Sequence, residues 1–418
     1  MTSKLLKGLG WGLLILVLLL ALPTALHYDK IRRLQHVLSL FEADRIVDNF
    51  LHMDTAFPTH KISRSSEPRP LARGPQLELP AQFRTADSTV LSQDFLDATG
   101  TTGLLVLHRD SIVFENYYRG HSAEQTHISW SVGKSMVSAL MGIALAEGHF
   151  ASIEDPITQY VSELKGSGYE GVSIKNILQM SSGVRFEEDY ADFYSDINRF
   201  GRSFALGSSL DEFSTSLVNE RPPGSYHHYV SINTQVLGML LVRTTGRSLS
   251  DYLEEKIWHP LGMEGEAQWI IDDAGMELAL GGLNARLRDY ARFGQLYLHQ
   301  GRVGDRQIVP QQWVLDSTRP DAPHLEPGDN PLSAHRKGYG YHWWIPERSD
   351  GDFVAIGVYN QYIYVDPHKD LVVVKNSANV HYEKDYDRSQ TYSIDFFRAI
   401  GATFPDRVAA ATPVLSTR

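Results

Sequence analysis

The chain of 418 residues contains no cysteine. Disulfide bonds, thiolate zinc sites and a cysteine nucleophile are therefore excluded, while an oxidising compartment stays possible because no thiol could be misoxidised there. The chain also lacks a dense Lys/Arg block, and acidic residues outnumber basic ones by 50 to 39, so we expect no nucleic-acid partner. It shows no internal repeat and no extended low-complexity segment. With 42% apolar residues, it can bury the core of one large domain or of two ordinary ones.

Charged residues are missing from one long stretch near the N-terminus. The run LGWGLLILVLLLALPTAL, residues 9–26, is close to the ~20 residues that cross a bilayer as a helix. No clean small-x-small cleavage site follows it. We therefore expect a basic tail at residues 1–8 and, at residues 9–27, a transmembrane anchor in contact with the lipid bilayer or an uncleaved signal.

The orientation of this segment is less clear from the charges. Three basic residues beyond the run offset the N-terminal lysines under the positive-inside rule: Lys30, Arg32 and Arg33. We expect a single-pass protein of a bacterial-type inner membrane, with its body in the periplasm or outside the cell. Secretion to the periplasm is the alternative.

Composition divides the rest of the chain. Residues 28–55 have apolar residues at helical spacing, whereas residues 61–82 are rich in Pro, Arg and Ser, and their prolines prevent a regular helix or a central strand. We expect a helical and Pro-rich connector at 28–95, a globular domain at 96–402 and a tail at 403–418.

Strand patterns lie at both ends of the globular domain. The segments TGLLVLH and SIVFENYY, within residues 102–118, predict a hairpin, and the stretches FVAIG, QYIYVD and LVVVKN, within residues 353–376, predict three further strands. A last helix is predicted at 389–401, and the middle, roughly 150–300, is mostly helical. This order predicts an α+β domain, with one sheet assembled from distant segments and a mostly helical insert.

Ser131 and Lys134 open the apolar run of a predicted helix in the sequence SVGK. Their spacing places the hydroxyl and the amine on one helix face, the helix N-terminus would favour an oxyanion, and burial would lower the pKa of the lysine and make it a base. The alternative is a serine N-cap beside a solvent-exposed lysine, and this segment alone does not decide. The same S-x-x-K letters recur at 162–165, at the end of a segment.

Two further motifs follow Ser131 in order. The stretch PPGSYHHYVSIN places Tyr229 five residues after Gly224, and AIG lies at 355–357 on a predicted strand. As an ordered set these motifs resemble the serine beta-lactamase and penicillin-binding-protein superfamily, in its class C-like and esterase-like branch, over about residues 96–402. They are most similar to the 6-aminohexanoate-oligomer hydrolase-like serine hydrolases, which share the Ala-x-Gly strand and the Gln after it.

The resemblance implies a beta-lactamase/transpeptidase-like fold, with an antiparallel sheet flanked by helices, and a role for each motif residue. Ser131 would be the nucleophile, and Lys134 and Tyr229 would share the proton transfers. The backbone N–H groups of Ser131 and Val358 would form the oxyanion hole. The resemblance calls for no metal or other cofactor. Three histidines could suggest a metal site, but no acidic residue lies at the spacing that metal ligands would need: His127, His227 and His228.

Two positions depart from the family pattern. The asparagine of Y-x-N is Ser231 here, although an overlapping S-x-N register ends at Asn233; the Pro-Gly spacing favours Tyr229. The third motif begins with Ala355 where the family has Lys or His, whose contact with a substrate carboxylate contributes about 1.5–3 kcal/mol. This loss argues against an efficient beta-lactamase or DD-carboxypeptidase and favours an ester or amide hydrolase.

Further residues are expected to contact the substrate. Ser231, Ala355 and Gly357 come from the motifs, and Asp189 and Tyr190 come from the acidic and aromatic segment 186–196. That segment is either a solvated acidic loop or a rim that recognises an amine-bearing substrate. A further S-x-N match at 377–379 follows the third motif and is discarded.

Together these observations predict a membrane-anchored serine hydrolase that cleaves small ester or amide substrates through an acyl-enzyme on Ser131. A beta-lactamase or DD-carboxypeptidase of the same fold remains an alternative. A second alternative is a non-catalytic sensor or scaffold, although such a protein has no need of Ser131, Lys134 and Tyr229 together. The oligomeric state stays open.

Overall fold

The computed structural model describes residue 11 and residues 25–407. Within these residues no helix combines the length and the apolar character needed to span a bilayer. The tail at 1–8 and nearly all of the expected membrane segment at 9–27 lie outside the described residues, as do residues 408–418.

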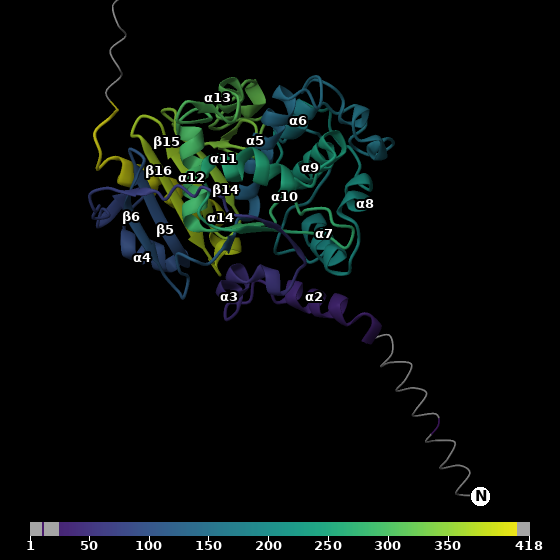
Figure 1. Cartoon of the computed structure of the whole chain (residues 1–418), viewed down its shortest axis with the longest axis horizontal. Helices are drawn as coiled ribbons and strands as arrows, with labels where there is room; N and C mark the ends of the chain where they lie inside the picture. The colour runs from purple at the N-terminus through teal and green to yellow at the C-terminus, as the bar shows by residue number, and fades with distance from the viewer. Residues whose placement is uncertain (1–10, 12–24, 408–418) are drawn as a thin grey trace, which may run out of the picture.

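An eight-stranded sheet joins segments from the two ends of the chain (Figure 1). From edge to edge its strands are β12 (Gly338–Tyr339), β13 (Trp344–Ile345), β14 (Phe353–Gly357), β15 (Gln361–Asp366), β16 (Leu371–Ser377), β5 (Thr101–His108), β6 (Ser111–Tyr117) and β2 (Ala72–Arg73). The predicted hairpin is confirmed as β5 and β6. The central pairings are antiparallel, with Val373 of β16 opposite Val106 of β5, while β2 pairs with β6 in parallel.

Both faces of this sheet are buried, which explains the uninterrupted apolar runs of its central strands. On β16, Val372 and Val374 belong to the larger core cluster, and α12 (Leu287–Leu298) packs on that face against β16, β15 and β5. Leu371 and Val373 belong to a second cluster that includes apolar residues of α14 (Tyr382–Gly401) and α4 (Ser92–Ala98). The predicted last helix thus begins at Tyr382, seven residues earlier than its pattern indicated.

The helical insert lies beside the sheet (Figure 1). Its helices are α5 (Gly133–Ala146), α6 (Ile174–Leu178), α7 (Asp196–Ala205), α8 (Leu210–Thr215), α9 (Ile232–Thr245) and α10 (Leu249–Leu253). The helices α5 and α9 pack against each other, and nearly all of their residues are buried. A small sheet has the order β1 (Thr59–Ile62), β8 (Ala267–Ile270), β9 (Leu283–Ala285) and β7 (His127–Ile128). Of these strands, β8 and β9 belong to the insert.

The segment before the globular domain is part of the same core. It forms α2 (Tyr28–Leu38), α3 (Ile46–Leu51) and the strand β1 of the small sheet. The ring of Phe41 stacks on Tyr359 with centroids 4.5 Å apart, and Phe50 contacts Trp130 at 5.4 Å. Residues 28–62 therefore pack directly beside Ser131, a contact that the sequence did not indicate.

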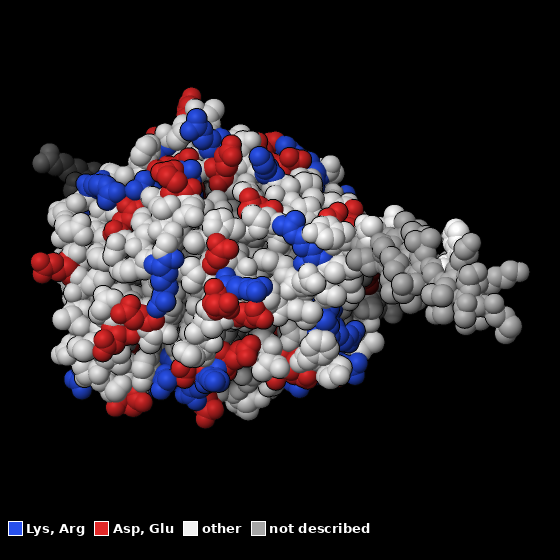
Figure 2. Space-filling view, turned by 90° about the horizontal axis from the view of Figure 1, so that it is seen from below, with Lys and Arg blue, Asp and Glu red and all other residues white. Residues whose placement is uncertain are grey.

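Charges of both signs are mixed on the surface. On the face in Figure 2, Lys and Arg side chains alternate with Asp and Glu side chains, and neither sign forms an extended patch. This distribution offers no electrostatic footprint for a nucleic acid on that face.

Candidate active site

Ser131 lies in a tight turn at the start of α5. The turn Trp130–Val132 is a 3-10 helix, and Trp130 has φ of +44°, a left-handed conformation that costs a bulky residue roughly 1–3 kcal/mol and is found mostly at functional sites. The N-cap of α5 is Val132, and the Ser131 hydroxyl instead accepts a hydrogen bond from Lys134. The N-cap interpretation of Ser131 is therefore wrong.

Lys134 is buried, with 1% of its surface exposed. Its Nζ donates to Ser131 Oγ at 2.8 Å and also to the Leu280 carbonyl oxygen. Burial lowers the pKa of Lys134 to about 7, against the opposing charge of Glu188. The alternative of a solvent-exposed lysine is thus also wrong, since this amine can be neutral near neutral pH and accept the proton of Ser131.

The second S-x-x-K match has none of these features. Ser162 lies in a short 3-10 helix, and its hydroxyl donates to its neighbour Glu163. Lys165 is exposed. Ser162 therefore provides a natural control for experiments on Ser131.

Tyr229 lies between the Pro-Gly turn and α9. Its ring stacks on Trp344 at 5.4 Å, and Lys134 Nζ lies 5.4 Å from its centroid. Burial raises the pKa of Tyr229 well above 10, while a hydrogen bond with Ser131 acts in the opposite direction. Asn233, the end of the alternative register, accepts hydrogen bonds from two buried side chains away from Ser131. The phenol of Tyr229 is therefore a neutral proton donor beside the nucleophile.

Glu188 is a site residue that the sequence did not single out. The backbone N–H of Ser231 donates to its carboxylate at 3.1 Å, the Ser231 hydroxyl donates as well, and Tyr190 donates at 3.2 Å. Burial raises the pKa of Glu188, and the charge of Lys134 lowers it. Ser231, in place of the family's asparagine, thus binds a carboxylate from a distant loop, and the charge of that carboxylate raises the pKa of Lys134.

The end of β14 lies against the backbone of Ser131. A Cβ added to Gly357 would lie 2.6 Å from the Ser129 carbonyl oxygen and 3.2 Å from the Ser131 nitrogen, so the two segments approach this closely only with glycine. The side chain of Gln361 donates to the Val358 carbonyl oxygen at 3.2 Å and holds the turn after β14. This places the Val358 backbone next to the nucleophile.

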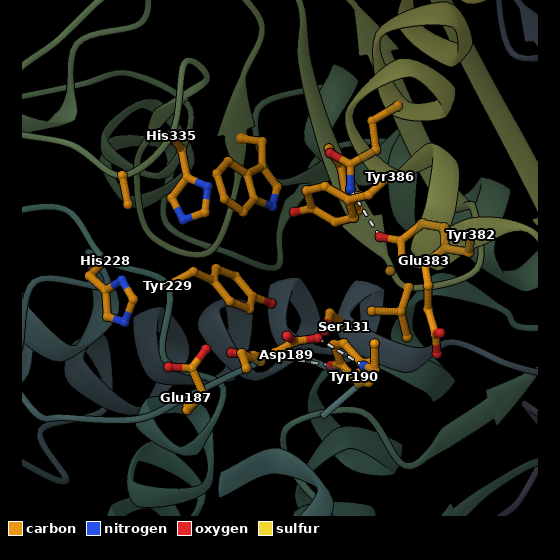
Figure 3. Close-up of a pocket in the computed structure, with 18 residues that line it drawn as sticks. Ser131, Glu187, Asp189, Tyr190, His228, Tyr229, His335, Tyr382, Glu383 and Tyr386 are labelled. Atoms are coloured by element: carbon orange, nitrogen blue, oxygen red, sulfur yellow. Dashed lines mark hydrogen bonds between the residues drawn. The ribbon is translucent and has the colours of Figure 1, made fainter. Parts of the chain in front are cut away.

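A cavity of about 360 Å³ opens at Ser131, and we call it the acidic cavity. Four carboxylate residues line it: Glu187, Glu188, Asp189 and Glu383. Within the part of the chain that the structure describes, no Lys or Arg lines it. Figure 3 shows that the Tyr229 side chain points toward Ser131. Tyr382 and Tyr386 face Tyr229 across the cavity.

The predicted contact residues are only partly brought together. Asp189, Tyr190, Gly357 and Val358 line the acidic cavity. Ser231 and Ala355 do not line it, since each is buried with 1% exposure. The sequence missed Tyr382, Glu383 and Tyr386, because the first turn of α14 lacks the apolar spacing that predicted the rest of this helix.

Metal-ligating side chains do not gather here. Among residues 25–407, no group of three or more His, Asp or Glu side chains is close enough to hold a metal ion. Of the three histidines singled out in the sequence, His127 is buried beside Phe50, His227 is buried beside Tyr339, and His228 lines the acidic cavity.

Comparison with known proteins identifies the family of the chain. A family model described as Beta-lactamase matches residues 93–395, which is most of the chain. The chain belongs to the beta-lactamase family. This family member is a serine hydrolase.

Individual relatives of this beta-lactamase-family protein are similar over most of its length. It is 29% identical over 337 residues to the 6-aminohexanoate-dimer hydrolase of Paenarthrobacter ureafaciens, which covers 79% of this chain and 84% of the relative. Its fold matches a putative 6-aminohexanoate-dimer hydrolase from Bacillus anthracis, with a TM-score of 0.76, 24% identity, and coverage of 86% and 95%. A putative beta-lactamase from Bacteroides dorei matches with a TM-score of 0.54, 21% identity, and coverage of 68% and 87%.

Proposed function

We propose that this protein hydrolyses small esters or amides through an acyl-enzyme on Ser131. The observation that carries the proposal is the hydrogen bond of 2.8 Å between the buried Lys134 amine and the Ser131 hydroxyl. An amine with a pKa near 7 is matched to base catalysis at neutral pH. A scaffold or sensor has no use for a lysine held in this state, because burying it destabilises the fold.

The first half of the reaction acylates the serine. Ser131 Oγ attacks the substrate carbonyl carbon while neutral Lys134 takes the hydroxyl proton, and the N–H groups of Ser131 and Val358 stabilise the oxyanion. When the oxyanion collapses, the bond to the leaving group breaks. Tyr229 gives its proton to the leaving alcohol or amine and regains one from Lys134.

The second half releases the acid. A water molecule attacks the acyl carbonyl and gives a proton to the Tyr229–Lys134 pair, and the bond to Ser131 Oγ breaks as that oxygen is protonated again. The enzyme returns to its starting protonation state, and the products are the acid and the alcohol or amine.

The charges at the acidic cavity favour ester and amide substrates without a carboxylate. Glu187, Asp189 and Glu383 line it, and Ala355 leaves the third motif without its cation. A beta-lactam or a D-Ala-D-Ala terminus would bring a carboxylate toward these acids, and no Lys or Arg lines the cavity among the residues that the structure describes. A leaving group that carries an amine would be attracted.

Turnover of p-nitrophenyl butanoate by wild type and by Ser131→Ala tests the proposal, with Ser162→Ala as the matched control. We expect wild type and Ser162→Ala to be equally active and Ser131→Ala to be inactive. A fluorophosphonate adduct should map to Ser131 by mass spectrometry. Turnover that survives in Ser131→Ala would refute the proposal, and labelling of wild type without turnover would favour the non-catalytic alternative.

We further propose that residues 9–27 anchor the enzyme in a bacterial inner membrane with the catalytic domain outside the cytoplasm. The uncharged run supports an anchor, and the absence of cysteine leaves an oxidising compartment possible. Fractionation of cells tests it: the full chain should sediment with membranes, and a chain starting at Tyr28 should not. Release of the full chain by a salt wash would contradict an integral anchor.

A further inference from the structure

A second cavity opens on the other side of Ser131. It has a volume of about 310 Å³ and shares Ser131, Tyr190, Ala191 and Val358 with the acidic cavity. We call it the apolar cavity. The nucleophile and the proposed oxyanion donor thus stand at the junction of two cavities of different chemistry.

Two segments outside the sequence motifs form much of the wall of the apolar cavity. The N-terminal segment contributes Phe41, Met53 and Phe57, and α7 contributes Phe200 and Phe204. The rings of Phe57 and Phe204 stack at 5.4 Å across the two segments. A site lined in this way binds aliphatic groups because it removes their surface from water.

A cationic ligand group finds no charged partner among the described residues that line this cavity. No carboxylate lines it within the described residues, and Arg202 is the one charged side chain there; its guanidinium lies 3.8 Å from the centroid of Phe193. The NH2 group of Asn198 donates to backbone carbonyl oxygens, one of them that of Tyr190 at 3.0 Å, which leaves its neutral Oδ1 as an acceptor. An ammonium group at the end of a bound chain would therefore meet no carboxylate to offset its loss of hydration.

We propose that the apolar cavity binds the acyl chain of the substrate and that this chain is neutral and aliphatic. Because the volume of the cavity is at the small end of the range for ligand sites, we expect a chain of about six to ten carbons. This proposal rests on the proposed hydrolase function of Ser131 and specifies the class of substrate on which it acts. Tyr229 lines only the acidic cavity. The leaving group that Tyr229 protonates therefore departs into the acidic cavity, and the acyl chain lies on the opposite side.

The chain length of p-nitrophenyl esters measures the first part of this proposal. With the full chain, kcat/KM should rise from the acetyl to the octanoyl ester, by up to about fourfold per methylene group. The heptanoyl and 6-aminohexanoyl esters have chains of the same length. The heptanoyl chain ends in a methyl group, and the 6-aminohexanoyl chain ends in an ammonium group. We expect the heptanoyl ester to be preferred by at least about tenfold. A flat series or a preference for the ammonium ester would overturn the proposal.

Gly201 allows the cavity to be filled without disturbing the backbone. It lines the cavity on α7, and an added Cβ would meet only Val37 Cγ1, at 3.9 Å. Gly201→Leu should lower kcat/KM for the octanoyl ester by at least about tenfold and leave the acetyl ester within about twofold. Ser203→Leu, on the same helix and outside the cavity lining, is the control and should change neither value.

A second variant and a second ester series keep the outcomes distinct. Val37→Phe fills the cavity from the α2 wall and should reproduce the selective loss seen with Gly201→Leu. An equal loss of kcat/KM for acetyl and octanoyl esters in both variants would overturn the proposal. The second series consists of acetate esters of long alcohols. A selective loss of kcat/KM for these esters would also overturn the proposal, because the cavity would then bind the leaving group. Absence of turnover for every ester by wild type would instead refute the hydrolase function itself.

Discussion

Ser231 donates two hydrogen bonds to the carboxylate of Glu188, one from its backbone N–H and one from its hydroxyl. The two residues are 43 positions apart, and their contact brings a carboxylate toward Lys134. The serine that departs from the family motif therefore holds an ionisable group whose charge raises the pKa of Lys134, and the pH dependence of the reaction should report that group.

The protonation state of Lys134 should set the acid limb of the pH profile. Because burial lowers its pKa to about 7, the neutral amine forms as pH rises through this value and is lost as pH falls below it. We expect kcat/KM for p-nitrophenyl butanoate to rise tenfold per pH unit well below 7 and to level off above it. A profile flat between pH 5 and about 9 would contradict a role for Lys134 as base.

Removal of the Glu188 charge should move this limb. The carboxylate raises the pKa of Lys134, so Glu188→Gln should shift the acid limb to lower pH. Glu187→Gln is the matched control, since Glu187 is the exposed neighbour at the same cavity, and it should leave the limb in place. Equal profiles for the two variants would show that Glu188 has a structural role alone.

The hydroxyl of Tyr229 should matter most for poor leaving groups. Tyr229→Phe keeps the stacking on Trp344 and removes the proton donor, so kcat should fall by about 10²–10⁴ for an alkyl ester or an amide. A nitrophenyl ester needs less proton transfer and should be less affected. Tyr226→Phe, at a neighbouring tyrosine outside the cavity lining, should leave kcat unchanged. A similar loss for all leaving groups would contradict the assignment of Tyr229 as the acid.

Gly357 should tolerate no side chain. A methyl group at this position would lie 2.6 Å from the Ser129 carbonyl oxygen, which would push Val358 away from the oxyanion. Gly357→Ala should lower kcat by about 10²–10³, the loss expected for one oxyanion donor, with little change in KM. Gly201→Ala, where the added Cβ makes an ordinary contact at 3.9 Å, is the control with the acetyl ester. Full activity of Gly357→Ala would place the donor elsewhere.

The acidic segment offers a paired test of amine recognition. Asp189 lines the acidic cavity, whereas Asp192 accepts a hydrogen bond from the Tyr194 backbone outside it. Asp189→Asn should raise KM for esters whose leaving alcohol carries an ammonium group by about threefold to tenfold and leave neutral esters unchanged. Asp192→Asn should change neither. An equal effect of both variants would indicate long-range charge alone.

Some elements of the fold could be predicted from the sequence, whereas some residues of the candidate site could not. The hairpin and the central strands depend on local spacing, and periodicity therefore predicted them. The S-x-x-K letters occur twice in the chain, so Ser131 and Lys134 were singled out by their order with the later motifs and by the family resemblance. The start of α14 was missed because Tyr382 and Tyr386 interrupt the apolar pattern and face the cavity. Glu188 could not be separated from its acidic neighbours, because its role comes from a contact across 43 residues.

The sequence by itself determined the order of the catalytic motifs, the α+β class and the absence of thiol chemistry. The tertiary structure decided whether the Lys134 amine is buried, which carboxylate faces it, and that residues 28–62 form a wall beside Ser131. The physical reason is that spacing along the chain sets which side chains share a helix face or a strand. Burial and charge, which set a pKa and shape a cavity, depend on segments that meet only in the folded chain.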